Sequence, residues 1–201
     1  MIVDLGTGDG RAALAAADAE PHALVLAVDA DAASMADASR RASRPAGRGG
    51  RPNLLFVVAA AEALPDELTG LADEVRILFP WGTLLRGVLG LDPAVAAGIA
   101  GLAAPHGRIA ALVSIAARDR VAALPALDEP ALDDLARRLR SSGLTLAGAR
   151  RATTDQVRAT HSSWGRRLLA GDARRPVWRL DLLPTGREDS RPDRRRRWAA
   201  V

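Results

Sequence analysis

The amino-acid sequence predicts an α/β fold, in which a mostly parallel sheet of seven strands carries helices on both faces. Short apolar runs alternate with helical stretches along most of the chain, and this alternation is the pattern of βαβ units. The first apolar run, residues 2–5, passes directly into the glycine-rich loop 6–10 and then into an Ala-rich helical stretch. A strand, a tight glycine turn and a helix in that order open a Rossmann-like sheet.

The same patterns predict strands and helices along the rest of the chain. We expect strands at residues 2–5, 23–28, 54–59, 74–79, 108–116, 144–149 and 177–183. We expect helices at residues 11–19, 31–44, 92–104, 130–142 and 154–159. Asp31 and Asp92 can each accept the N-cap hydrogen bond of the helix that follows, and Gly143 suits a C-cap. A basic, Gly/Pro-rich loop at 45–52 separates the second helix from the third strand.

One domain accounts for the length of the chain, because 201 residues are enough to bury a sizeable core. We expect this domain to span residues 1–183 and the polar, Arg-rich residues 184–201 to form a disordered tail. No apolar run is long enough to cross a bilayer, and there is no signal-peptide pattern. We therefore expect a cytoplasmic protein with no membrane contact.

Composition limits the chemistry that the chain can perform. It has no Cys, which excludes disulfides, thiolate metal sites and a cysteine nucleophile. The three His residues are scattered without metal-ligand spacing, so we expect no metal. The net charge is +4 and all 28 basic residues are Arg, the side chain best suited to bidentate phosphate contacts. This charge is compatible with a nucleic-acid partner but does not establish one.

Two acids frame the glycine-rich loop. Asp4 lies in the first strand, and Asp29 follows the second strand about 20 residues beyond the loop, where a carboxylate can bind the ribose hydroxyls of a nucleoside ligand. The glycine spacing differs from the Gly-x-Gly-x-x-Gly dinucleotide fingerprint. Asp4-x-Gly-x-Gly-x-Gly followed by Asp29 resembles instead the S-adenosylmethionine (SAM) site of class I methyltransferases. The alternative is a plain tight turn and a solvated Asp, and Asp9 is expected to cap the first helix.

The fourth predicted strand ends in Phe79-Pro80-Trp81-Gly82. Ligands of such sheets bind at the carboxyl ends of the strands, so this turn is where a methyl acceptor is expected. Enzymes that methylate exocyclic amino groups of bases place a polar residue where this chain has Phe79, which argues against that reaction. The lack of Cys argues against covalent methylation of pyrimidine C5. Trp81 can stack on a base or pack in the core.

Residues 79–87, which contain Pro-Trp-Gly-Thr-Leu-Leu, and the downstream run Ser163-Trp164-x-Arg166-Arg167-Leu168 together resemble a known family. It is the family of 16S rRNA (adenine(1408)-N(1))-methyltransferases, which confer aminoglycoside resistance. The likeness covers residues 2–183. It implies a class I methyltransferase fold, SAM as cofactor, and 16S rRNA within the small (30S) ribosomal subunit as partner of a monomeric enzyme.

The resemblance also implies roles for particular residues. Trp81 and Trp164 match two tryptophans on separate loops that hold the flipped target adenine in the family, so we expect both residues on loops and their rings facing an empty site in the free enzyme. The implied SAM contacts are Asp4, Gly6, Gly8, Asp29, Ala60, Glu62, Leu78 and Thr83. The implied contacts to the rRNA backbone are Arg166, Arg167, Arg174 and Arg175. Neutral adenine N1 carries a lone pair that can attack the sulfonium methyl without a general base, and two indole faces would favour the cationic product.

The chain departs from the family at its start, where relatives carry a segment ahead of the first strand that helps to cover SAM. We expect the domain to lack this extension, and residues 117–129 look short for an RNA-gripping insertion. Two other interpretations stay open: a SAM-dependent methyltransferase acting on a small molecule or another RNA, and a non-catalytic RNA- or SAM-binding homologue. We expect Trp178 in the core, Trp198 and the run 194–197 in solvent, and a structural role for His161.

Overall fold

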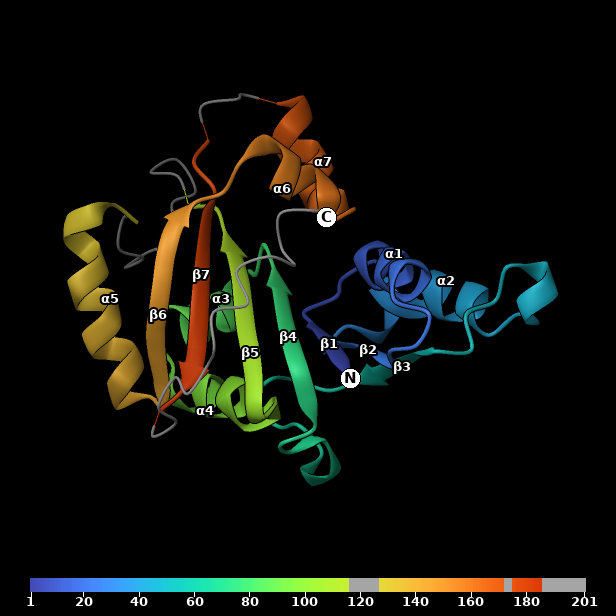
Figure 1. The fold of residues 1–201 in the computed structure, drawn as a ribbon, viewed down its shortest axis with the longest axis horizontal. Coiled ribbons are helices and arrows are strands. Elements are labelled where there is room, and N and C mark those ends of the chain that lie inside the picture. The colour runs from blue at the N-terminus through green and yellow to red at the C-terminus, as the bar shows by residue number, and fades with distance from the viewer. Residues whose placement is uncertain (116–126, 172–174, 186–201) are drawn as a thin grey trace.

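The computed structural model describes residues 1–115, 127–171 and 175–185. Their strands form one seven-stranded sheet in the order β3-β2-β1-β4-β5-β7-β6 (Figure 1). The strands are β1 (Ile2–Leu5), β2 (Val25–Asp29), β3 (Leu54–Val58), β4 (Ala72–Leu78), β5 (Ala103–Val113), β6 (Leu144–Arg151) and β7 (Trp178–Pro184). The first five run parallel, and β7 is antiparallel to both β5 and β6. The predicted mostly parallel, seven-stranded sheet is confirmed.

The helices connect the strands, and five of the seven correspond to predicted helices. They are α1 (Arg11–Ala19), α2 (Ala32–Ala42), α3 (Gly82–Val88), α4 (Pro93–Leu102), α5 (Glu129–Ser141), α6 (Thr154–Ala159) and α7 (Ser163–Ala170). Asp31 caps α2 by accepting from the Ala33 N–H, and Asp92 caps α4 by accepting from the Val95 N–H. These two caps are the ones that the sequence predicts.

Helices lie on both faces of the sheet (Figure 1). On one face α1 and α2 pack against β1, β2 and β3 through small side chains such as Ala13 and Ala17, which allow a close approach. On the other face α3, α4 and α5 pack against the centre of the sheet through larger side chains such as Leu85, Ile99 and Leu135. The two cores account for most of the buried apolar residues, so the sheet is a rigid base for the loops at its carboxyl edge.

Ion pairs occupy part of the sheet that no described helix covers. On the face of β4 and β5 opposite α3–α5, Glu74 is buried, with Arg76 Nε 2.5 Å and Arg108 Nη2 3.4 Å from its carboxylate. A buried carboxylate needs such partners to offset its loss of hydration. Within the described residues, the helices on this face are α1 and α2 at β1–β3 and α6 and α7 at the carboxyl ends of β4 and β5.

Two of the helices, α3 and α7, are absent from the sequence prediction. α3 begins at Gly82, which has a φ of 55°, and no side chain caps it. α7 contains Gly165 in its first turn, and glycine weakens a helical pattern. The expectation that Trp164 lies on a loop is therefore wrong, because Trp164 belongs to α7. Ser162 caps this helix by accepting from the Gly165 N–H.

β5 begins earlier than predicted. Pro105 and Gly107 indicated a turn before residue 108, yet the strand starts at Ala103, which pairs with Ala72 of β4. The register then shifts between Ala72 and Glu74. A Cβ on Gly107 would lie 2.3 Å from the Ala72 carbonyl oxygen, so a glycine allows the two strands to stay together at this irregularity.

Some predictions fall outside the described residues. They concern residues 117–126 of the region 117–129 that looks short for an insertion, Arg174, and residues 186–201 with Trp198 and the run 194–197. The predicted domain boundary at residue 183 stays a prediction. Among the described helices, none is long and apolar enough to span a membrane by itself, although α3 and α4 would pass the same test as a pair bent by 75°.

Trp178 is a core residue, as predicted. It is 4% exposed, and the Arg151 guanidinium carbon lies 4.4 Å from its ring centroid. We expect Trp178→Ala to lower the free energy of unfolding by about 3–5 kcal/mol, because it leaves a cavity in the core. Urea denaturation measures this change, and Trp81→Ala is the matched control at an exposed tryptophan. A loss below about 1 kcal/mol would show that Trp178 is not packed as described.

Candidate functional site

Glycines shape the loop between β1 and α1. Gly6, Gly8 and Gly10 have φ angles of 76°, 57° and 69°, in the left-handed region that residues with a Cβ rarely adopt. At Gly6 a Cβ would also lie 2.4 Å from Leu84 Cδ2 of α3. Both the path of the backbone and the packing against α3 therefore require glycine here.

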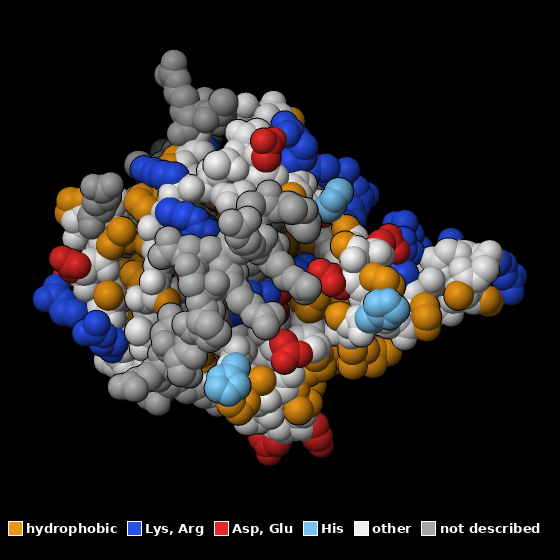
Figure 2. All heavy atoms as spheres, in the orientation of Figure 1, with side chains coloured by type: hydrophobic (Ala, Val, Ile, Leu, Met, Phe, Trp, Pro, Cys, Tyr) orange, Lys and Arg blue, Asp and Glu red, His pale blue; other side chains and the backbone are white. Residues whose placement is uncertain are grey.

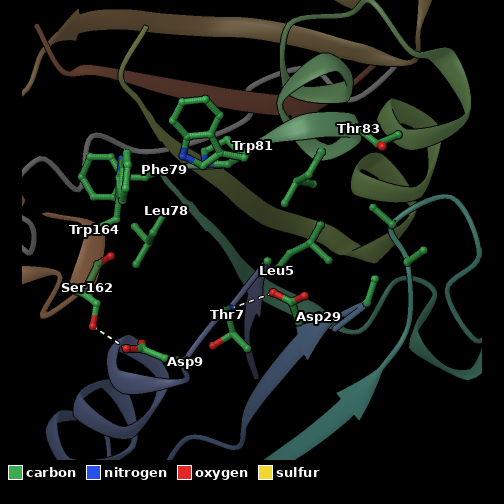
Figure 3. Close-up of a pocket in the computed structure, with 18 of the residues that line it drawn as sticks. Leu5, Thr7, Asp9, Asp29, Leu78, Phe79, Trp81, Thr83, Ser162 and Trp164 are labelled. Carbon is green, nitrogen blue, oxygen red and sulfur yellow. Dashed lines mark hydrogen bonds between the residues drawn. The ribbon is translucent and has the colours of Figure 1, made fainter. Parts of the chain in front are cut away.

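Asp29, at the end of β2, fixes this loop from the neighbouring strand. The Gly8 N–H donates to Asp29 Oδ2 at 2.8 Å (Figure 3), and the Asp31 N–H donates to Asp29 Oδ1 at 2.9 Å. Each carboxylate oxygen can accept more than one hydrogen bond, so both oxygens keep capacity for the hydroxyls of a ligand. The side chain is half-buried at the edge of the cavity.

Asp4 lies beneath the loop and is 2% exposed. Its Oδ2 accepts a hydrogen bond from Thr7 Oγ1 at 2.6 Å, while its Oδ1 is buried without a partner among the described residues. Burial raises the pKa of Asp4 to about 6, although the Thr7 hydroxyl and the charge of Arg76 act in the opposite direction. An unpaired buried oxygen is costly, and a positively charged group at this loop would relieve that cost.

A cavity of about 530 Å³ opens at the carboxyl edge of β1, β2 and β4 (Figure 3), which is within the range of cofactor sites. It is lined by Leu5, Gly6, Thr7, Gly8, Asp9, Asp29, Ala30, Ala59, Ala60, Ala61, Glu62, Leu78, Phe79, Pro80, Trp81, Thr83, Leu84, Ser162, Ser163, Trp164 and Arg167. All the predicted cofactor residues except Asp4 line this cavity. Both predicted base-stacking tryptophans line it as well, so the fold brings the two predicted sets together.

Phe79 turns the chain sharply where β4 ends. Its φ is 54°, which is rare for a bulky residue and is held here by the surrounding structure. The Phe79 N–H donates to the Leu112 carbonyl oxygen of β5 at 2.8 Å, and its ring is 5% exposed. A Cβ on Gly165 of α7 would lie 3.2 Å from that ring. Phe79 thus connects β4, β5 and α7 directly under the mouth of the cavity.

Trp81 and Trp164 meet at this mouth (Figure 3). Their ring centroids are 5.5 Å apart and their planes are at 90°, an edge-to-face contact. Trp81 is 43% exposed, and Trp164 packs partly against the small cluster around Phe79 and Val157. The sequence led us to expect two rings facing an empty space. The structure corrects this, because the perpendicular rings touch and leave no parallel slot for a base in this state.

The predicted RNA-binding arginines occupy different positions. Arg167 lines the cavity and Arg166 is exposed beside it. Arg175 is half-buried, and its guanidinium donates to Ser114 Oγ at 2.8 Å and to the Ser114 carbonyl oxygen at 2.9 Å. Arg175 therefore holds the end of β5 as well as carrying charge. Arg174 lies outside the described residues.

Ser163 was missed as a residue of the site. Its Oγ lies 2.5 Å from Asp9 Oδ2, across the mouth of the cavity. Asp9 accepts the Arg11 N–H at 3.3 Å, although Gly10 is the N-cap residue of α1. No local signal could have found this pair, because its members are 154 residues apart in sequence. The part of the chain that the structure describes contains no cluster of three or more acidic or His side chains suited to a metal.

Comparison with known proteins gives a consistent result. Residues 1–181 match the protein family described as 16S rRNA (adenine(1408)-N(1))-methyltransferase. The protein of that name from Streptoalloteichus hindustanus is 38% identical over 173 residues, which cover 84% of this chain and 80% of the relative. The one from Escherichia coli is 30% identical over 179 residues, which cover 86% of this chain and 82% of the relative.

Solved structures of similar proteins share the whole fold. The 16S rRNA methyltransferase KamB superposes with a TM-score of 0.82 at 35% identity, covering 91% of this chain and 87% of that one. A variant of the 16S rRNA (adenine(1408)-N(1))-methyltransferase from Catenulisporales acidiphilia, solved with its cosubstrate SAM, has a TM-score of 0.82 at 32% identity. That match covers 96% of this chain and 88% of the neighbour.

The raised pKa of Asp4 makes stability depend on pH in a definite direction. Between the ordinary value of 3.8 and about 6, the folded protein holds a proton at Asp4 that the unfolded chain has lost. The contribution of Asp4 to stability is therefore present below pH 4 and lost as the pH rises through 6. As the pH rises through this window, we expect the unfolding free energy of the wild type to fall by roughly 3 kcal/mol relative to that of Asp4→Asn.

Urea denaturation of both proteins from pH 4 to pH 7, without ligand, measures this difference. Groups other than Asp4 titrate in both proteins and cancel in the comparison. Parallel stability curves for the two proteins would contradict the buried, unpaired state of Asp4.

Proposed function

The chain belongs to the 16S rRNA (adenine(1408)-N(1))-methyltransferase family, and we propose that it transfers the methyl group of SAM to N1 of an adenine in the decoding site of 16S rRNA. Its substrate is the rRNA within the small ribosomal subunit, which places its action in the cytoplasm, and methylation there confers aminoglycoside resistance. One observation carries the proposal. Two tryptophans stand at the mouth of a cavity whose floor is the glycine loop and Asp29.

The residues of the cavity fit SAM. Asp29 is held by two backbone N–H groups and keeps free lone pairs for the two ribose hydroxyls. Ala60 and Leu78 offer apolar surface to a purine ring, from the loop after β3 and the end of β4. The orphaned Oδ1 of Asp4 lies under the loop where the methionine part of SAM would lie, and the ammonium group of SAM can supply the missing positive charge. Bound SAM supplies a methyl group on a sulfonium, which is a strong electrophile.

The reaction needs no base from the protein. The lone pair of adenine N1 forms the new N–C bond, the C–S bond breaks, and its electron pair stays on the departing sulfur. The purine ring becomes cationic. Trp81 and Trp164 would hold the flipped base with N1 in line with the methyl, which is a near-attack geometry. Their indole faces would favour the positive charge that develops on the ring, by about 0.5–2 kcal/mol.

Binding of the base requires the two tryptophans to separate. In the structure they meet edge to face, an arrangement worth about 0.5–1.5 kcal/mol beyond the area that it buries. Stacking contributes about 1–3 kcal/mol per base, which is enough to offset the loss of the contact between the two rings. Trp81 is the ring with more freedom, because it is more exposed than Trp164. We propose that Trp81 swings away and closes on the base.

Basic side chains lie beside the mouth of the cavity, on α7, and along the segment that projects beyond α2. Arg166 and Arg167 lie on α7. Other exposed arginines lie in the last turn of α2 and in the projecting segment after it, namely Arg40, Arg41, Arg44 and Arg48. In Figure 2 basic side chains mark the molecule from α7 to the tip of this projection. Such a spread suits a folded RNA surface better than a small acceptor. A small-molecule substrate is the second candidate, and the open mouth with its exposed Trp81 argues against it.

We expect Asp29→Ala to weaken SAM binding tenfold or more, which is about 1.4 kcal/mol or above. The change removes the acceptor for the ribose hydroxyls and releases the Gly8 N–H of the loop. Isothermal calorimetry measures the affinity. Asp37→Ala on α2, an exposed acid paired with Arg40, is the control and should bind SAM like the wild type. Unchanged SAM affinity in Asp29→Ala would contradict the cofactor site.

The function itself is tested by methyl transfer from labelled SAM to purified small subunits, with the modified base mapped. We expect Trp81→Ala and Trp164→Ala to lose most of this activity and Trp→Phe at either position to keep part of it, because a smaller stacking face remains. SAM affinity should change little in all four variants. Trp81→Ala should also leave the melting temperature nearly unchanged, whereas Trp164→Ala should lower it modestly through the Phe79 cluster. Full activity of both Ala variants would rule out the base-stacking role.

A further inference from the structure

A hydrogen bond between Ser163 and Asp9 crosses the mouth of the cavity. Ser163 is the first residue of α7, Asp9 lies in the loop before α1, and their oxygens are 2.5 Å apart. Both side chains line the cavity, from opposite walls. An ionised carboxylate has no proton to donate, so the Ser163 hydroxyl is the donor. The bond joins the wall that holds the cofactor to the wall that carries Trp164.

Two arginines extend this contact. Arg166 Nη2 lies 3.3 Å from Ser163 Oγ and donates to it, and Arg11 Nε lies 3.4 Å from Asp9 Oδ2. The Arg166 guanidinium occupies the acceptor side of the hydroxyl, which leaves the hydroxyl proton directed to Asp9. The direction of the chain Arg166 to Ser163 to Asp9 is thus fixed by charge.

Asp9 also lies between the N-termini of two helices. Its Oδ1 accepts from the amide of Arg11, the first residue of α1, and its Oδ2 accepts from Ser163, the first residue of α7. The N-terminus of a helix carries partial positive charge, which a nearby carboxylate favours. A single carboxylate therefore stabilises the start of both helices in this relative position.

The rest of α7 packs on apolar side chains of the neighbouring elements. Trp164 and Leu168 pack on the cluster of Phe79, Leu112 and Val157, which fixes the height of the helix above the sheet. Apolar packing of this kind is not directional. A charge-assisted hydrogen bond is directional, and the one at Ser163 is immediately next to Trp164. Of the two kinds of contact, the hydrogen bond is therefore the one that can define the position of the indole along the mouth.

We propose that Ser163 and Asp9 are positioning residues, whose hydrogen bond sets the distance between the tryptophan on α7 and the cofactor loop. Neither side chain takes part in making or breaking bonds. The inference rests on the proposed function, in which Trp164 stacks on the target adenine while the loop holds SAM. It goes further in coupling the two halves of the site, since a loop held by cofactor also holds α7 in place.

The first test compares Ser163→Ala, which removes the donor, with Ser163→Thr, which keeps the hydroxyl. We expect Ser163→Ala to lower kcat for methyl transfer to small subunits by about threefold to tenfold, and its SAM affinity to stay within about twofold of the wild type. Ser163→Thr should recover most of the rate. Ser141→Ala is the matched control, because its exposed hydroxyl bonds to the Arg138 carbonyl oxygen within α5, and it should behave like the wild type.

A double-mutant cycle identifies the partner. Asp9→Ala loses the bond to Ser163 together with the contact to the Arg11 amide, so it should have the larger effect. In that background Ser163→Ala should cause no further loss of kcat, because the bond is already absent. Additive losses, or failure of Ser163→Thr to recover the rate, would overturn the proposal.

Hydrogen exchange of the α7 amides provides a readout that needs no RNA. We expect residues 164–170 to exchange about threefold faster or more in Ser163→Ala than in the wild type, and SAM to slow this exchange in the wild type but not in the variant. Wild-type protein that transfers no methyl to rRNA would refute the proposed function, while the exchange data would still test the bond. Equal exchange and equal kcat in wild type and Ser163→Ala would overturn the inference.

Discussion

The left-handed turn at Phe79 is the constraint on which the acceptor side of the site depends. A bulky residue in this conformation costs about 1–2 kcal/mol, and the turn is stabilised by burial of the ring, which contributes about 1.5–3 kcal/mol. Its N–H keeps β4 paired with β5, and its ring supports α7 at Gly165. A straight continuation of β4 would carry Trp81 away from the cavity. The turn instead brings Trp81 into contact with Trp164.

The two halves of the cavity are built by different means. The cofactor half uses parallel strands, a glycine loop and a carboxylate on the neighbouring strand, so backbone groups define it. The acceptor half uses side chains on α3 and α7 and is completed by helices inserted between β6 and β7. Backbone geometry tolerates little change, whereas side chains on short helices can reorient. This difference fits a site that keeps one ligand constant and must admit a base from a folded RNA.

The sequence predicted the parts of the structure that local patterns control. The succession of strands along the chain, the glycine loop, Asp29 beside it and Trp81 at the end of β4 all follow from periodicity and spacing, and the resemblance added Trp164. The sequence did not predict the helices α3 and α7, because each contains a glycine that weakens the helical pattern and because each is stabilised by packing on the body of the protein. The φ of Phe79 and the bond between Asp9 and Ser163 depend on contacts between distant segments, which no single stretch of sequence contains. Edge-to-face contact of the tryptophans likewise depends on how α7 packs.

The position of β7 between β5 and β6 has a consequence for how the enzyme is made. A ribosome synthesises β1 to β4 and α3 first, so the cofactor half can fold on the emerging chain. Among the described strands, β6 pairs only with β7, and α7 precedes β7 in the chain. Trp164 of α7 therefore belongs to the part of the site that is synthesised last, whereas the glycine loop and Asp29 lie in the first part of the chain. The cofactor half is local in sequence, and the acceptor half is complete only when the end of the domain has been made.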